Sequence, residues 1–193
     1  MKITWWKLLC IALLIYTVIA GLLVDVPQLP LLQETIRNLY FHVCMWIVMM
    51  ILFTISVVYA IKYLSSNKLK YDIQSRQYVG TGILFGVLGY STGVLWMLFT
   101  WADPTQKVTA SFSSVSKDPK LLGAAISLLI YFAYLILRDS ITNFDKRAKI
   151  SAVYNIFAYV FLFPFIWILP RMLPSLHPGA EGNPALNLSL IHI

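Results

Sequence analysis

The chain has 193 residues, of which 59% are hydrophobic and only 12% charged, a composition that excludes an ordinary soluble globular domain. Its formal net charge of +7 is accounted for by basic segments that face anionic lipid. Outside those segments the chain has no basic stripe with interleaved aromatic residues, so we expect no nucleic-acid partner.

Five apolar runs are long enough to cross a bilayer as helices, which takes roughly 20 residues each. Length favours helices over strands, because a spanning strand needs only about 9–11 residues. The sequence therefore predicts an all-α, polytopic membrane bundle that forms one transmembrane domain over residues 1–193. The predicted spans cover residues 8–24, 39–61, 79–101, 121–137 and 150–169.

The first run follows Lys2 and Lys7 and so resembles a signal peptide. Its apolar core exceeds the roughly 7–15 residues of such peptides, and the segment 25–27 (Asp-Val-Pro) offers no cleavage site between small residues. We therefore interpret this run as a membrane helix that the mature chain retains.

Lysine and arginine predict the orientation. With the N-terminus in the cytoplasm, ten basic residues lie on the inner side and five on the outer side, as the positive-inside rule favours. The longest inner connection is then a polar loop over residues 62–78. The outer side holds residues 25–38, residues 102–120 and everything after Pro170.

Two histidines belong to this outer side. His42 is predicted one turn inside the second span, with Trp46 one turn further on the same helix face. His177 follows the fifth span between Pro174 and Pro178, which restrict the backbone around it. Neutral imidazole is a common axial ligand of haem iron, so this pair could bind one iron from opposite sides. The alternative for either residue is a histidine hydrogen-bonded at the headgroup level.

Cationic and aromatic residues lie near these histidines. Arg37 and Arg171 could each pair with a haem propionate or reach a lipid phosphate instead. Trp96 and Trp101 close the third span, although tryptophans also gather at membrane interfaces by default. His192, near the end of the sequence, is interpreted as incidental.

Sequence motifs for enzymatic chemistry are missing. The chain has no GxxxxGK[ST], HExxH or GxSxG motif and no carboxylate pair within a predicted span, so we expect no catalytic activity. Cys10 and Cys44 lack CxxC spacing and are interpreted as apolar packing residues.

Four motifs, taken in order, resemble those of the CcmC-type proteins. These haem-handling membrane proteins of bacterial cytochrome c maturation are related to the CcsA type. The motifs span nearly the whole chain, and they are residues 37–43 (RNLYFHV), 89–96 (GYSTGVLW), 118–121 (DPKL) and 176–179 (LHPG).

The resemblance implies that His42 and His177 are the axial ligands of a haem b cargo. It also implies an outer platform for presenting haem that includes Trp96, Trp101 and Asp118. A periplasmic haem chaperone would receive the haem, beside ABC transporter subunits and a small membrane subunit, at the bacterial inner membrane.

Two features depart from the family pattern. The family has six spans, whereas this sequence predicts five and a shortened C-terminus, since four prolines interrupt the 24 residues after Leu169. The loop 102–120 lacks the family's tryptophan cluster and holds one aromatic residue, Phe112. Two alternatives stay open: a transporter or structural subunit without haem, and an integral electron-transfer cytochrome with paired histidines.

Overall fold

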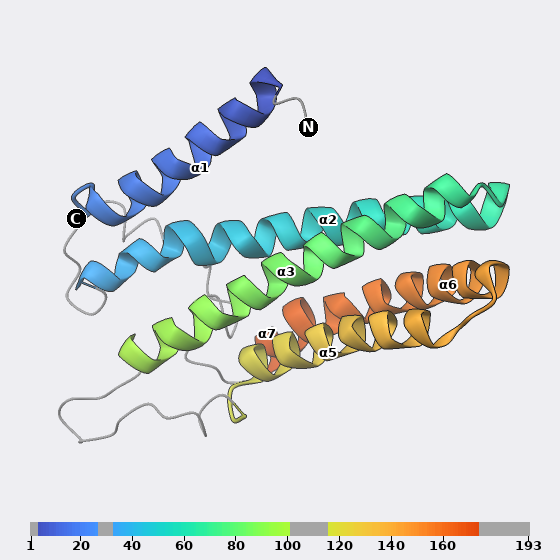
Figure 1. The fold of residues 1–193 in the computed structure, drawn as a ribbon. Helices are drawn as coiled ribbons and strands as arrows, with labels where there is room; N and C mark the ends of the chain where they lie inside the picture. Colours follow the sequence, from blue (N-terminus) through green and yellow to red (C-terminus); the bar gives the residue numbers. More distant parts are fainter. Residues whose placement is uncertain (1–3, 27–32, 101–115, 174–193) are drawn as a thin grey trace.

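The described part of the chain is helical. The computed structural model describes residues 4–26, 33–100 and 116–173, and no strand occurs within these ranges. The prediction of an all-α bundle is therefore confirmed. The helices are α1 (Trp5–Leu23), α2 (Asn38–Ser66), α3 (Leu69–Thr100), α5 (Pro119–Ser140), α6 (Phe144–Phe163) and the short α7 (Leu169–Met172) (Figure 1).

Two short segments complete these elements. The 3-10 helix η1 (Gln33–Arg37) leads into α2, and the π-helical segment η2 (Pro164–Ile168) joins α6 to α7. Together they give five helical stretches whose length and composition suit a membrane span, which indicates a multi-pass membrane protein. These stretches are Trp5–Leu23, Glu34–Ser66, Leu69–Thr100, Pro119–Ser140 and Phe144–Met172.

The connection between the second and third spans differs from the prediction. The polar segment 62–78, expected as a loop, is helical except for Asn67 and Lys68. Asn67 takes a left-handed conformation with φ of 52° and ends α2, as is common at helix C-termini. The polar side chains of this segment include Asp72 and Ser75, both buried in the bundle. The helices continue through this segment because its polar side chains are buried against other helices. Apolar periodicity in the sequence does not predict such burial.

Helices α2 and α3 form a long antiparallel hairpin through close helix contact. Large side chains on α2 lie against glycines on α3, where a Cβ atom would come within 2.6–3.2 Å of them. Small residues of this kind let membrane helices approach closely. The pairs are His42 with Gly93, Trp46 with Gly89, Met49 with Gly86 and Phe53 with Gly82.

Helices α5 and α6 pack against this hairpin and close the core. The ring of Phe53 stacks on Tyr131 of α5, with the centroids 3.7 Å apart. Val79 and Ile83 of α3 and Leu162 of α6 belong to the same buried cluster. Four helices therefore contribute to this central apolar cluster, and two smaller buried clusters lie elsewhere in the bundle.

Near its end, the fifth span changes its hydrogen-bonding pattern. Pro164 has no N–H, which interrupts the α-helical ladder. The Leu169 N–H then donates to the Pro164 carbonyl, the wider spacing of a π-helix. Gly123 of α5 lies so close to this segment that a Cβ atom would stand 2.2 Å from the Phe165 carbonyl oxygen. Helices α5 and η2 therefore touch backbone to backbone.

Helix α1 stands apart from the other helices (Figure 1). None of its residues is buried. It meets α2 near its C-terminal end, where the Phe41 ring lies against Gly21. In a bilayer this apolar helix needs no protein cover, because lipid provides it.

Candidate functional site

His42 lies in the second turn of α2, with its side chain buried between helices. Its Nδ1 is 2.8 Å from the Gly89 carbonyl oxygen and 3.2 Å from Thr92 Oγ1. A carbonyl oxygen only accepts, so Nδ1 carries the proton and donates it to Gly89. The neutral ring then has its lone pair on Nε2, the nitrogen that can bind a metal.

The Thr92 hydroxyl fits the same assignment. It lies 2.9 Å from the carbonyl oxygens of both Leu88 and Gly89, so it donates to the helix backbone and its oxygen can accept from His42. The Thr92 carbonyl in turn accepts from Asn38 Nδ2 at 3.0 Å. These contacts fix the start of α2 against α3 and hold the imidazole in one orientation.

Two tryptophans flank the imidazole edge-on. The ring centroids of Trp46 and Trp96 are 6.2 and 6.1 Å from that of His42. Trp46 stands on the face of α2 predicted from its spacing, whereas Trp96 approaches from α3. Trp96 Nε1 also donates to Thr35 Oγ1 at 3.3 Å, which ties α3 to η1. The histidine is thus surrounded by aromatic rings from two helices.

The Arg37 side chain forms hydrogen bonds and an ion pair at the junction of α1 and α2. Its Nη1 donates to the carbonyl oxygens of Gly21 and Val24 at the C-terminal end of α1. Its Nε lies 2.7 Å from Glu34 Oε2. A cation at a helix C-terminus satisfies carbonyl groups that have no partner within the helix. These contacts give Arg37 a structural role, and its predicted pairing with a propionate stays a prediction.

Asp118 caps α5. Its Oδ1 accepts from the backbone N–H groups of Lys120 at 2.9 Å and Leu121 at 3.0 Å, and Pro119 occupies the first helical position. This is a common N-terminal arrangement for an α-helix. The side chain is buried, so the acid predicted for the haem platform has a structural role at the start of α5.

Arg171 lies in α7, with its guanidinium carbon 5.2 Å from the centroid of the Trp167 ring. The start of α2, the end of α3, the start of α5 and α7 all lie at the same end of the bundle (Figure 1). His42, Trp96, Asp118 and Arg171 therefore share one end, which we call the histidine end. His177 and Trp101 lie outside the described residues, as does His192.

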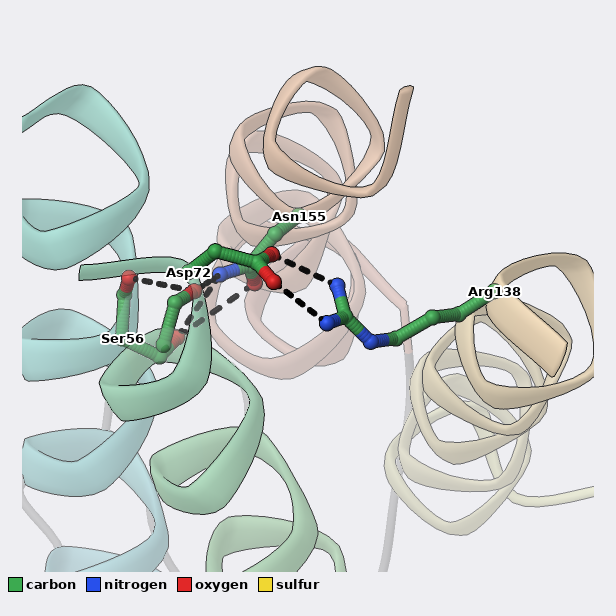
Figure 2. Close-up of polar contacts among 5 residues, drawn as sticks. Ser56, Asp72, Arg138 and Asn155 are labelled. Atoms are coloured by element: carbon green, nitrogen blue, oxygen red, sulfur yellow. Dashed lines mark hydrogen bonds and ion pairs between the residues drawn. The ribbon is translucent and has the colours of Figure 1, made fainter. Parts of the chain in front are cut away.

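At the opposite end, two charged residues form a buried ion pair (Figure 2). Arg138 of α5 donates to Asp72 of α3 through two parallel hydrogen bonds of 2.7 and 2.6 Å. Both side chains are less than 10% exposed. Bidentate pairing of this kind matches the guanidinium fork to the carboxylate and keeps both charges neutralised away from water.

An amide and two hydroxyls lie beside the ion pair (Figure 2). Asn155 Nδ2 of α6 donates to Ser56 Oγ at 3.0 Å and to Ser75 Oγ at 3.1 Å, and Ser75 Oγ donates to the Ser56 carbonyl at 3.0 Å. The three residues come from three helices and satisfy one another. We interpret these three residues, with Asp72 and Arg138, as a structural cluster, and we call this end of the bundle the ion-pair end.

Sequence reasoning missed most of these partners. Arg138 fell directly after the predicted fourth span, whereas Asp72 fell within the predicted loop 62–78, so their pairing was not expected. Gly89, Thr92 and Gly93 belong to a motif already noted, but their contacts with His42 were not predicted. The glycines at 82, 86, 89 and 93 carried the clearer signal, because small residues at three- and four-residue spacing are typical of membrane helix contacts.

The described residues hold no cluster of three or more His, Cys, Asp or Glu side chains that could bind a metal ion. Haem differs from a bare ion, because its iron takes only one or two axial ligands from protein.

No protein-family model matches this chain, and comparisons with curated proteins and with solved structures likewise return no match. The resemblance to CcmC-type proteins therefore stays a prediction from the motifs.

Proposed function

We propose that this chain binds haem at the histidine end and delivers it to a periplasmic partner, without catalysing a reaction. The observation that supports the proposal most is the hydrogen bond from His42 Nδ1 to the Gly89 carbonyl. A metal-binding histidine typically donates its other ring nitrogen in this way, which fixes the tautomer and makes the ligand nitrogen more basic.

The surroundings of His42 suit haem chemically. Trp46 and Trp96 provide apolar aromatic surface beside the imidazole, and Arg171 is a cation at the same end of the bundle. His177 is the proposed second axial ligand, as the motif resemblance implies. Haem b would be cargo rather than a resident cofactor, because a site near the membrane surface lets a partner reach it.

The depth of His42 favours transfer over electron transport. The residue lies in the second turn of α2, near one end of a span that runs from Glu34 to Ser66. Integral cytochromes that carry electrons usually place both ligands within their spans. The proposed partners are a periplasmic haem chaperone, ABC transporter subunits and a small membrane subunit, at a bacterial inner membrane.

Absorption spectroscopy tests the proposal. The protein is purified in mild detergent from haem-sufficient cells, as wild type and as His42→Ala and His177→Ala. We expect a Soret band in the wild type that falls in both variants, and His192→Ala serves as the matched control that keeps it. Added imidazole should restore the band in His42→Ala. A wild-type protein that carries no haem, even with its partners coexpressed, would overturn the proposal.

A purely structural role for His42 is the second candidate, and its burial against Gly93 favours it. His42→Asn separates the two roles, because the amide Nδ2 of asparagine replaces the Nδ1 donor to Gly89 but leaves no ligand nitrogen. Loss of haem with unchanged thermal stability supports haem binding. An unchanged haem content in this variant would leave only the structural role.

A further inference from the structure

A shallow, open depression in the surface, which we call the groove, lies on the outer face of α6. Its volume is about 440 Å³, and it is lined by Lys149, Ile150, Val153, Tyr154 and Phe157. Ile150, Val153 and Phe157 are each about half exposed. In a multi-pass membrane protein such a face meets lipid, so the groove opens toward the acyl chains.

The walls of the groove are apolar, even where a tyrosine contributes. The Tyr154 hydroxyl donates to the Ile130 carbonyl of α5 at 3.1 Å, so its polar atom is used within the bundle. The positions from Ile150 to Phe157 extend over about 10 Å of helix. This length and chemistry suit the part of one hydrocarbon chain that lies nearest its headgroup.

Two lysines lie at one end of this apolar stripe. Lys149 lines the groove, and Lys146 lies one turn before Ile150 on the same helix face. Both side chains are exposed, and neither forms an ion pair with another residue in the described part of the chain. A pair of cations above an apolar groove matches an anionic headgroup above its acyl chain.

We propose that this groove binds an anionic phospholipid, with the phosphate at Lys146 and Lys149 and one acyl chain along Ile150, Val153 and Phe157. The site lies at the end of the bundle opposite His42 and does not depend on haem. Under the predicted orientation this end faces the cytoplasm, where anionic lipid attracts basic side chains.

Native mass spectrometry of the detergent-purified full chain tests the site. The wild type is incubated with phosphatidylglycerol or phosphatidylcholine of identical acyl chains. We expect preferential retention of phosphatidylglycerol, reduced about thirtyfold in Lys146→Gln/Lys149→Gln, since each surface lysine contributes about 1 kcal/mol to anionic lipid binding. The matched control, Lys68→Gln/Lys70→Gln, removes the same charge at the same end and should retain the lipid.

A second variant tests the groove itself. Val153→Trp fills it without altering charge, and it should also lower retention of phosphatidylglycerol severalfold. Equal retention of the two lipids by the wild type would overturn the proposal. So would equal losses in the two lysine variants, which would mean a diffuse basic surface, or full retention in Val153→Trp, which would leave the headgroup bound without the groove.

Discussion

The two ends of the bundle use polar groups in different ways. At the ion-pair end, Asp72 and Arg138 neutralise each other through two hydrogen bonds, and Asn155 joins Ser56 to Ser75. At the histidine end, His42 Nδ1 donates to the Gly89 carbonyl of α3 and lies 3.2 Å from Thr92 Oγ1. One cluster thus joins charged and polar side chains from four helices, whereas the other fixes a single imidazole between two helices. We expect the first cluster to stabilise the fold, whereas the proposed function assigns haem binding to the second.

Removing one charge at the ion-pair end should produce the largest effect. Arg138→Met leaves the Asp72 carboxylate buried without its partner, which we expect to cost about 3–5 kcal/mol of stability. Thermal unfolding in detergent measures this loss. The double variant Asp72→Leu/Arg138→Met should recover most of it, because apolar replacement of both partners leaves no buried charge. An equally stable Arg138→Met protein would contradict the structural role of the pair.

Gly123→Ala, which adds a methyl group, should have the second largest effect on stability. Its Cβ would meet the Phe165 carbonyl oxygen, and a backbone atom cannot rotate away as a side chain can. We expect Gly123→Ala to destabilise the protein by roughly 1–3 kcal/mol through overpacking. Gly80→Ala is the control, since its Cβ would meet only the flexible end of Arg76. Equal melting temperatures for the two variants would mean that α5 and η2 separate without cost.

At the histidine end, Gly93→Ala should weaken haem binding more than it destabilises the fold. A Cβ at position 93 would stand 2.6 Å from His42 Cε1, so Gly93→Ala must displace the imidazole. We expect haem affinity to fall roughly tenfold, within the range for disturbed support of a metal ligand. Haem titration followed at the Soret band measures it. A stability loss without any change in affinity would place His42 with the structural residues.

Thr92→Val should have the smallest effect. It removes one of two acceptors for His42 Nδ1 and leaves the shorter bond to Gly89 intact. We expect a loss of about 1 kcal/mol or less in haem binding. Thr92→Ser keeps the hydroxyl and should bind as the wild type does. If valine and serine weaken haem binding equally, the methyl group of Thr92 matters and its hydroxyl does not.

The apolar runs alone predicted the five helical stretches, because the length of a run determines whether it can cross a bilayer. Helix ends were harder to predict, since Asp72 and Arg138 are charged residues whose burial inside the helices is offset by their pairing with each other. The partners of His42 lie 47 and 50 residues along the chain, on another helix, so local pattern could not pair them. The role of His177 stays a prediction.

The exposure of helix α1 predicts how fast its sequence changes during evolution. Because none of its residues is buried against the bundle, selection on α1 acts mainly through length and apolarity rather than shape. Substitutions among Leu, Ile, Val and Phe should therefore accumulate there faster than in α3, where glycines match the side chains of α2 one by one. The slow positions of this region should be Gly21, Arg37 and Phe41, where α1 joins α2.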